Sequence, residues 1–394
     1  MVQHEVPRLG VGMVGYAFMG RAHSQAWRVA PRFFELPLRP EMAVLAGRSE
    51  GPLRDAAATL GWADVTTDWR TLLTRDDIDL IDIGSPGDTH AEIAIAALDA
   101  GKHVLCEKPL ANTVAEAEAM TAAAERAASR GVLAMVGFSY RRVPALTFAR
   151  DLIAQGRIGA VRQVRAQYLQ DWLADPESPL TWRMDKARAG SGALGDIAAH
   201  IVDAVQFLTG EAVTGVSGLL ETFVDERPVA AGPGTGLAGS PGVERGPVTV
   251  DDAALFLARL SGGAVATFEA TRFAWGRKNA LRLELNGETG SIAFDMEAPN
   301  ELHVFDATVP AREAGYRRIL VTEPDHPYAG AWWPPGHLLG YEHAFTHQVV
   351  DLVRAIAAGE QPTPTFADGL AVQRVLEAVE RSAADDSRWT AVEG

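Results

Sequence analysis

The chain has 394 residues, 47% of them hydrophobic, which is enough apolar material for two folded domains. Lys and Arg number 36 against 51 Asp and Glu, and the net charge of −15 argues against a nucleic-acid-binding protein, whose contact face is basic. The single cysteine, Cys106, excludes an internal disulfide and favours a reducing compartment. We find neither a signal-peptide pattern nor an apolar run that could cross a bilayer, and therefore expect a cytoplasmic protein.

The stretch RLGVGMVGYAFMGRAH, residues 8–23, contains two overlapping glycine patterns. A dinucleotide-binding turn needs a buried strand before it and a helix after it. The pattern on Gly10, Gly12 and Gly15 leaves only EVPR, which contains a proline, as the strand. The pattern on Gly15, Ala17 and Gly20 leaves the apolar RLGVGMV as the strand and FMGRAHSQAWRVA as the helix. We therefore expect the second pattern, with the helix N-terminus supplying partial positive charge for a pyrophosphate.

Strand-like and helix-like segments alternate from there to about residue 137. Further strands are expected at EMAVLAGRS (41–49), DIDLIDIGSP (77–86), KHVLCEKP (102–109) and VLAMVGFSY (132–140). Helices are expected at 89–101 and 113–131, the latter opened by a capping box of Thr113 and Glu116. This alternation predicts an α/β fold whose first domain, residues 1–137, is a doubly wound parallel sheet of the Rossmann type.

The end of the second strand bears on the choice of cofactor. It reads Gly47, Arg48, Ser49, without the acid that normally binds the ribose hydroxyls of NAD. An arginine with a hydroxyl neighbour is typical of a 2′-phosphate site and favours NADP. Arg48 is equally compatible with a solvated position stacking on the adenine of NAD. The segment PRFFELPLRP, residues 31–40, is expected to be a loop inserted before this strand.

From residue 138 onward the pattern changes. After a helix within residues 142–159, the segment AVRQVRAQYLQDW (160–172) alternates like a half-buried strand. Residues 251–273 and 279–296 each predict a hairpin. We expect residues 138–394 to form an α/β substrate-binding domain with a large, mostly antiparallel open sheet. Its uncovered face suits a homodimer or homotetramer. The Gly/Pro-rich segment 228–247 is expected to be a surface loop, with a lid or dimer arm as the alternative.

Two segments contain the candidate catalytic residues. In CEKP, Lys108 lies at the carboxyl end of a parallel strand, where ligands bind, and a lysine there can donate to a substrate hydroxyl. A structural pair with Glu107 or Asp82 is the alternative, and Cys106 is expected to be a buried apolar residue. In AGSGALGDIAAHIVDAVQFLTG, Asp196 and His200 are four residues apart, on one face of a helix near its start.

A histidine near neutral pKa suits the removal of a proton from a hydroxyl that loses its hydride. Asp196 would orient the substrate or the imidazole, or it would only complement the helix dipole.

Taken together, GYAFMGRAH, CEKPLA and GALGDIAAH resemble the Gfo/Idh/MocA oxidoreductase family over nearly the whole chain. Within it, the similarity is strongest to the branch of levoglucosan dehydrogenases and related sugar 3-dehydrogenases. The resemblance implies NAD(P)-linked oxidation of a secondary hydroxyl, at C3, of a sugar, anhydrosugar, glycoside or cyclic polyol. It also implies a C-terminal sheet used for oligomerisation.

The resemblance assigns roles to residues. Lys108 contacts substrate and nicotinamide, while Asp196 and His200 bind the substrate, with His200 as acid/base. The cofactor is lined by Gly15, Tyr16, Ala17, Phe18, Met19, Ser85, Pro86, His90 and Glu107, together with Arg48. The resemblance favours NAD whereas Arg48 favours NADP, so either cofactor is expected.

Other residues are expected to frame the sugar. They are Tyr140, Arg141, Gln170, Asp171, Trp172, Trp182 and Arg183, with Trp332, Trp333, His337 and Tyr341 of the late aromatic segment 326–343. For the two late tryptophans, core packing or a subunit contact is an equal alternative. His343 and His347 lack the intervening Glu of a zinc-binding helix, so no metal site is expected.

Two other functions remain open from the sequence. The same scaffold can use bound NAD transiently to cleave glycosides through a 3-keto step. A non-catalytic cofactor-binding protein is the second alternative, although the presence of Lys108, Asp196 and His200 argues against it.

Overall fold

The computed structural model describes residues 6–230 and 241–393, and their contacts divide the chain into two units. The first unit comprises the residues up to Ser139 together with Glu342–Leu370, and the second comprises Tyr140–Tyr341 and the residues from Ala371 onward. The division after Ser139 falls two residues beyond the boundary predicted from the sequence. Residues 342–370, which the sequence assigned to the second domain, belong by their contacts to the first unit.

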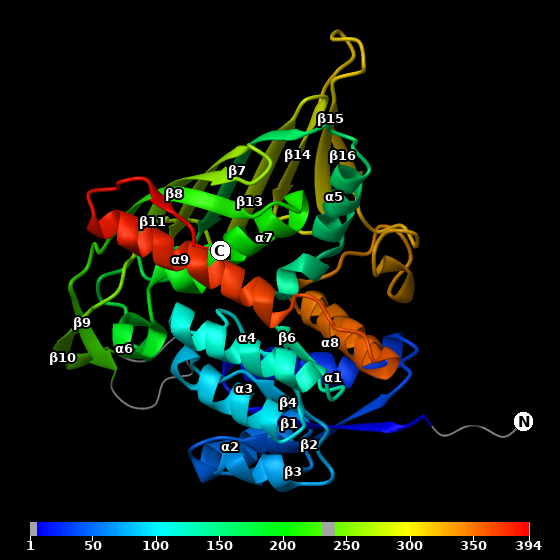
Figure 1. The fold of residues 1–394 in the computed structure, drawn as a ribbon, viewed down its shortest axis with the longest axis vertical. Coiled ribbons are helices and arrows are strands. Elements are labelled where there is room, and N and C mark those ends of the chain that lie inside the picture. Colours follow the sequence, from blue (N-terminus) through cyan, green and yellow to red (C-terminus); the bar gives the residue numbers. More distant parts are fainter. Residues whose placement is uncertain (1–5, 231–240, 394) are drawn as a thin grey trace, which may run out of the picture. The chain divides into compact units, whose positions relative to one another are not determined.

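The first unit is built on a parallel sheet with the strand order β3-β2-β1-β4-β5-β6 among the residues described (Figure 1). The order reverses at β1, as in doubly wound folds, and every neighbouring pair is parallel. The strands are β1 (Arg8–Val14), β2 (Arg39–Ala46), β3 (Asp64–Thr66), β4 (Leu80–Ile83), β5 (His103–Cys106) and β6 (Ala134–Val136). The expected doubly wound sheet is confirmed. Strand β3 was missed because three residues carry no periodic signal.

The second glycine pattern is confirmed by the first strand and helix. Gly10 and Gly12 lie within β1, and helix α1 (Phe18–Phe33) begins after the turn at Gly15. Gly15 has a φ of +103°, which side chains rarely adopt. A Cβ at Gly20 would lie 2.4 Å from the Gly15 carbonyl oxygen, so the helix approaches the turn as closely as glycine allows.

The loop expected at residues 31–40 is wrong in extent. Helix α1 continues through Pro31 to Phe33, and β2 already begins at Arg39, which leaves residues 34–38 as the connection. Proline in the last turn removes one backbone donor but does not stop the helix, because Trp27 and Ala30 remain buried in the core.

The core of the first unit lies against this sheet. Helices α1, α2 (Glu50–Leu60), α3 (His90–Asp99) and α4 (Val114–Ala128) follow successive strands, and the capping box of Thr113 and Glu116 opens α4 as predicted. Val349, Val350 and Val353 of helix α8 (Tyr341–Ala358) join the same hydrophobic cluster as Leu45 and Leu80. This burial explains why a segment so late in the chain belongs to the first unit.

The second unit is built on a sheet with the order β16-β15-β14-β13-β7-β12-β11-β8-β17 among the residues described. Only β7 and β12 pair in parallel, so the sheet is mostly antiparallel, as expected. Its strands are β7 (Val161–Leu169), β8 (Val213–Glu221), β11 (Ala253–Leu260), β12 (Val265–Thr271), β13 (Ala280–Gly287), β14 (Gly290–Asp295), β15 (Glu301–Asp306), β16 (Arg317–Leu320) and β17 (Thr390–Ala391). Both predicted hairpins are present, as β11–β12 and β13–β14.

Helices cover one face of this sheet. Helix α7 (Ala199–Thr209) packs on β7, and α5 (Pro144–Ala154) packs on β14 and β15. The short α6 (Lys186–Ala189) also belongs to this unit, and α9 (Phe366–Ala384) enters it at Ala371. Strands β9 (Glu226–Ala230) and β10 (Pro241–Pro247) form a separate pair. The flanks of the predicted Gly/Pro-rich loop, residues 228–230 and 241–247, are therefore paired strands rather than loop, while its centre, residues 231–240, lies outside the described residues.

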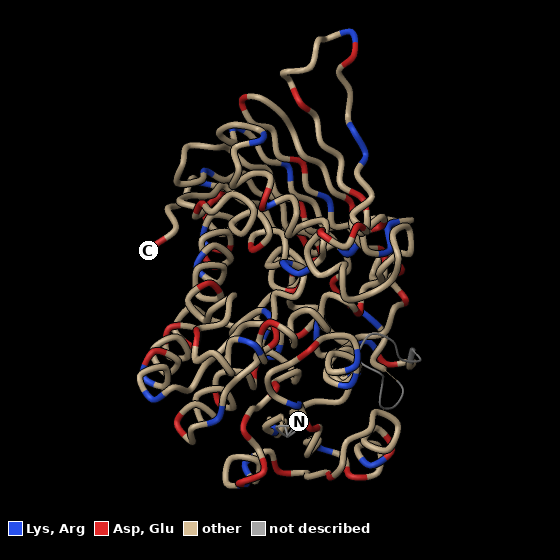
Figure 2. The backbone as a smooth tube through the Cα atoms, turned by 90° about the vertical axis from the view of Figure 1, so that its right-hand side faces the viewer, with Lys and Arg blue, Asp and Glu red and all other residues tan. Residues whose placement is uncertain are grey.

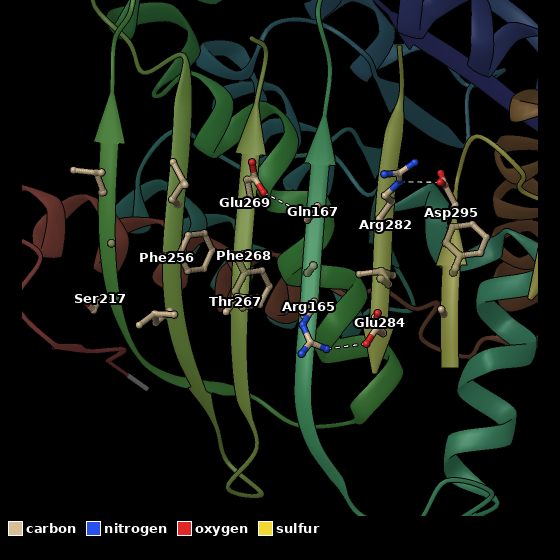
Figure 3. A pocket seen from close by; sticks show the side chains of 18 of the residues that line it. Arg165, Gln167, Ser217, Phe256, Thr267, Phe268, Glu269, Arg282, Glu284 and Asp295 are labelled. Atoms are coloured by element: carbon tan, nitrogen blue, oxygen red, sulfur yellow. Dashed lines mark hydrogen bonds and ion pairs between the residues drawn. The ribbon is translucent and has the colours of Figure 1, made fainter. Parts of the chain in front are cut away.

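The other face of the sheet presents side chains of both signs around exposed leucines. Arg165 pairs with Glu284, Gln167 with Glu269 and Arg282 with Asp295 across an open hollow of about 620 Å³ (Figure 3). Leu219, Leu255 and Leu257 border the same hollow and are about half exposed. Elsewhere along the chain Lys and Arg are interspersed with Asp and Glu (Figure 2). None of the predicted catalytic residues lines this hollow.

Candidate active site

The glycine turn of the first unit has the features of a phosphate site. A Cβ at Gly15 would lie 2.8 Å from the Gly84 carbonyl oxygen, so two strand ends meet closely beneath the turn. Ala17 occupies the N-cap of α1 and provides no side-chain cap, and the N-terminus of a helix is a favourable place for an anion. Phe18 is exposed at this N-terminus. These residues fit the pyrophosphate of NAD(P).

The loop after β4 is tied to the loop after β5 through His90. The Nε2 and Nδ1 atoms of this buried ring lie 2.9 and 3.0 Å from the carbonyl oxygens of Ser85 and Pro109. The predicted cofactor residue His90 therefore fixes the backbone of both loops. Arg48 is exposed at the end of β2, one residue before Ser49 at the N-cap of α2.

A buried ionic cluster lies beneath Lys108. His23 Nδ1 is 2.8 Å from Asp82 Oδ1, and His23 Nε2 is 2.9 Å from Glu107 Oε1. Trp27 Nε1 also donates to Asp82 at 2.7 Å. The two carboxylates that the sequence offered as partners of Lys108 are thus both bound by His23. The backbone N–H of Lys108 donates to Glu107 Oε2 at 3.2 Å.

In the second unit, the segment that contains Asp196 begins with a π-helical turn. This turn, η5 (Leu194–Ala198), leads directly into α7, where His200 is the second residue. The sequence predicted the two residues on one face of a helix near its start. The helix is continuous through both, and Asp196 lies in its π-helical turn, which the sequence did not predict. Such turns occur frequently at functional sites.

Two buried charges hold this turn in place. Arg272 Nη2 donates to Asp196 Oδ2 at 2.8 Å and to the Gly192 carbonyl oxygen at 3.1 Å. Asp251 accepts from the N–H groups of Gly192 and Leu194 at 2.7 and 2.8 Å. Burial raises the pKa of Asp251, against the opposing effect of these hydrogen bonds. Asp196 is therefore anchored from behind while 28% of its side chain stays exposed.

Aromatic rings surround His200. Tyr140 stacks on the imidazole with ring centroids 4.4 Å apart, and Tyr168 meets it edge-on at 5.8 Å. Tyr341 contacts Tyr140 edge-on at 6.3 Å. The Tyr140 and Tyr168 hydroxyls are 2.8 Å apart, and burial raises the pKa of Tyr168 well above its ordinary value. The Tyr168 phenol therefore stays a neutral hydrogen-bonding group at physiological pH.

Polar side chains extend from this aromatic group to Arg272. The Tyr168 hydroxyl and Gln170 Nε2 both donate to Asn279 Oδ1, at 2.7 and 2.9 Å. Trp172 Nε1 donates to Gln170 Oε1 at 2.9 Å, and its ring lies 5.3 Å from the Arg272 guanidinium carbon. One chain of contacts thus joins the predicted residues Tyr140, Gln170, Trp172, Asp196 and His200.

The other residues that were predicted to bind the substrate make contacts outside this chain of contacts. Arg183 lies over the Trp182 ring, and burial lowers its pKa while the nearby Asp196 raises it. Asp171 is bound by Lys278 and by the Gly276 N–H, and Arg141 is paired with Asp203 of α7. His337 is exposed and contacts the Pro334 carbonyl oxygen, while the rings of Trp332 and Trp333 are 6.5 Å apart.

The residues of these arrangements that were not predicted include His23, Tyr168, Arg272 and Asn279. The inward alternation of β7 contained a signal for Tyr168. Arg272 directly follows β12, a strand whose alternate residues are buried. A charged residue at the end of such a strand is a sequence signal for a buried ion pair. Within the described residues no group of three or more His, Cys, Asp or Glu is arranged to hold a metal ion. None of the described helices has the length and apolar character to cross a membrane.

Comparisons with known proteins identify the family of the chain. Residues 9–138 match the model of an oxidoreductase family with an NAD-binding Rossmann fold, and residues 146–293 match the GFO/IDH/MocA C-terminal domain. The chain is 43% identical to levoglucosan dehydrogenase of Pseudarthrobacter phenanthrenivorans over 388 residues, which are 98% of each chain.

Solved structures are similar over the same range. An oxidoreductase domain protein from Kribbella flavida shares 65% identity at a TM-score of 0.94, with 98% of this chain and all of that one covered. Levoglucosan dehydrogenase in complex with NADH and levoglucosan shares 41% identity at a TM-score of 0.91, with 98% and 100% covered.

Proposed function

The chain belongs to the Gfo/Idh/MocA oxidoreductase family, and from that premise we propose that it oxidises a secondary hydroxyl of a carbohydrate. The substrate is a sugar, anhydrosugar, glycoside or cyclic polyol, and the carbon oxidised is C3. The observation that carries the proposal is the polar and aromatic chain from His200 to Asp196, which offers a proton acceptor and an anchored carboxylate to a polyhydroxylated molecule. The 43% identity to a levoglucosan dehydrogenase supports the substrate class.

The catalytic roles follow from the chemistry of the side chains. Bound NAD(P) supplies the hydride acceptor. Lys108 donates to the reacting oxygen, and His200 removes its proton as the carbonyl forms. One hydroxyl becomes one carbonyl, with one hydride passed to the cofactor and one proton released. Asp196, held by Arg272, accepts a hydrogen bond from a neighbouring hydroxyl.

The remaining predicted residues complete the two binding sets. The substrate set also includes Tyr140, Gln170, Trp172, Arg183, His337 and Tyr341. The cofactor set consists of Gly15, Tyr16, Ala17, Phe18, Met19, Arg48, Ser85, Pro86, His90, Glu107 and Lys108. Arg48 is exposed after β2, where NAD-specific enzymes normally have an acid that binds the ribose hydroxyls. With arginine at this position, the site accommodates either NAD or NADP.

A substrate panel tests the proposal. Monosaccharides, anhydrosugars, inositols and glycosides are incubated with the enzyme and either NAD or NADP, while reduced nicotinamide is followed by its absorbance. We expect lasting reduction of the cofactor with at least one free sugar or polyol, and an oxidised C3 in the product by NMR. Product release without net reduction would indicate glycoside cleavage through a 3-keto step. An absence of turnover with every compound and both cofactors would contradict an enzymatic role.

The outer face of the second sheet supports the proposal that the protein is a homodimer or homotetramer. Its paired charges and the half-exposed Leu219, Leu255 and Leu257 suit a contact with a second copy. Leu257→Lys should lower the molar mass measured by light scattering at micromolar concentration without unfolding the protein. An unchanged mass would contradict this face as the interface. The proposal also places the enzyme in the cytoplasm, where the one cysteine, Cys106, stays reduced in the core.

A further inference from the structure

His23 is a buried titratable residue to which the proposed chemistry gives no role. It lies on α1, in the motif GYAFMGRAH, and its side chain is 1% exposed. Its two ring nitrogens contact Asp82 of β4 and Glu107, the residue after β5, which are 59 and 84 residues away in the sequence. Asp82 is fully buried and the Glu107 side chain is 5% exposed. His23 is thus the centre of an ionic cluster that joins three elements of the first unit.

The cluster needs a positive charge to persist. Two buried carboxylates this close to one ring would repel each other unless a cation or a shared proton lay between them. Burial alone would lower the pKa of His23, but the charges and hydrogen bonds of Asp82 and Glu107 outweigh it and raise the pKa from 6.5 to about 10. The ring also lies near the uncharged Phe345 of α8, with ring centroids 5.5 Å apart.

The cluster also reaches the backbone of Lys108. The Glu107 carboxylate binds His23 through Oε1 and the Lys108 N–H through Oε2. It has little room to move, because a Cβ at Gly137 would lie only 2.7 Å from Oε1. On the other side of Lys108, the Pro109 carbonyl oxygen is held by His90. The backbone is therefore fixed on both sides of the lysine, and His23 provides the charge for one of those sides.

We propose that His23 is a positioning residue for the oxidation: it fixes Glu107, and through Glu107 the backbone from which Lys108 projects. This inference rests on the proposed function, in which Lys108 donates to the reacting oxygen. His23 touches neither substrate nor cofactor in this role. Its effect falls on kcat, because a lysine displaced by about 1 Å loses alignment with the transition state and such a shift can cost on the order of 100-fold.

A double-mutant cycle separates positioning from general stability. H23Q removes the cation, and we expect kcat to fall about 10- to 100-fold. K108M removes the lysine itself. In H23Q/K108M the effect of H23Q should largely disappear, because the residue it positions is absent. If the two losses multiplied instead, His23 would act independently of Lys108 and the inference would be overturned.

The matched control is Trp27→Phe. Trp27 lies one helical turn from His23 and donates through Nε1 to Asp82, which binds the His23 ring nitrogen opposite the one that binds Glu107. W27F should lower the melting temperature while kcat stays close to that of the native enzyme. A loss of kcat in W27F equal to that in H23Q would show that the cluster acts only through folding, against the proposal.

A second measurement needs no turnover. Nitrogen-15 NMR of the histidine-labelled, cofactor-free protein, with the His23 signals assigned by their loss in H23Q, should show a protonated imidazole at pH 8. Titration of that ring near neutrality would contradict the cluster as described. A native rate in K108M would remove the proposed role of the lysine, whereas a native rate in H23Q beside an impaired K108M would remove only the role of His23.

Discussion

The two units each use a buried cation to hold a carboxylate next to a proposed catalytic side chain, but the carboxylates differ in exposure. Glu107 is held by His23 and is 5% exposed, whereas Asp196 is held by Arg272 and is 28% exposed. An enclosed carboxylate has its oxygens engaged by protein groups and acts on the backbone beside it. A partly exposed one, such as Asp196, keeps 28% of its side chain accessible to a ligand. Burial therefore separates the carboxylate proposed to position a neighbour from the carboxylate proposed to bind substrate.

The largest expected effect is the loss of kcat on substituting His200. It tests whether proton transfer depends on the second unit while cofactor binding depends on the glycine turn of the first. His200→Ala should lower kcat by about 10²- to 10⁴-fold, the usual contribution of a positioned acid/base. The affinity for NAD(P), measured by fluorescence titration of the free enzyme, should stay unchanged because the glycine turn is untouched. Turnover at the native rate would exclude His200 as the base.

A smaller effect tests the anchor of the exposed carboxylate. Arg272→Met leaves Asp196 without its cation, and kcat/KM for the sugar should fall about 10- to 100-fold as the carboxylate loses its position. The matched variant R272K keeps the charge but loses the planar fork, so it should be intermediate. The effect of R272M should shrink in a D196N background. Equal losses in both backgrounds would show that Arg272 does not act through Asp196.

The enclosed cluster predicts a dependence of stability on pH. The pKa of His23 rises from 6.5 to about 10 on folding, so its stabilising contribution is complete below pH 6.5 and is lost as the pH rises through about 10. Between about pH 7 and 8.5 unfolding should release about one proton from this site. The free energy of unfolding should therefore fall by about 1.4 kcal/mol for each unit that the pH rises.

Denaturant unfolding of the native protein and of H23Q over this range checks the effect, since contributions common to both cancel in the difference. Equal slopes for the two proteins would contradict a charged His23.

Local patterns in the sequence determined much of the fold. The choice between the glycine patterns followed from which one left an apolar strand and an unbroken helix, and Gly15 and Gly20 then had backbone reasons to be glycine. The capping box at Thr113 and the hairpins β11–β12 and β13–β14 were predicted correctly as well. Capping and alternation depend on neighbours a few residues apart, so the local sequence specifies them. The segments that contain Lys108, Asp196 and His200 were found in the same way.

Only the tertiary structure decided which charges meet. His23 binds Glu107, which is 84 residues away in the sequence, and Arg272 binds Asp196, which is 76 residues away. No local pattern specifies either pair. The same holds for residues 342–370, whose valines are buried with the first unit although they follow most of the second unit in the chain. A sequence records which side chains are apolar or charged. The packing of distant elements determines which are removed from water, and a buried charge must then be met by a partner that this packing supplies.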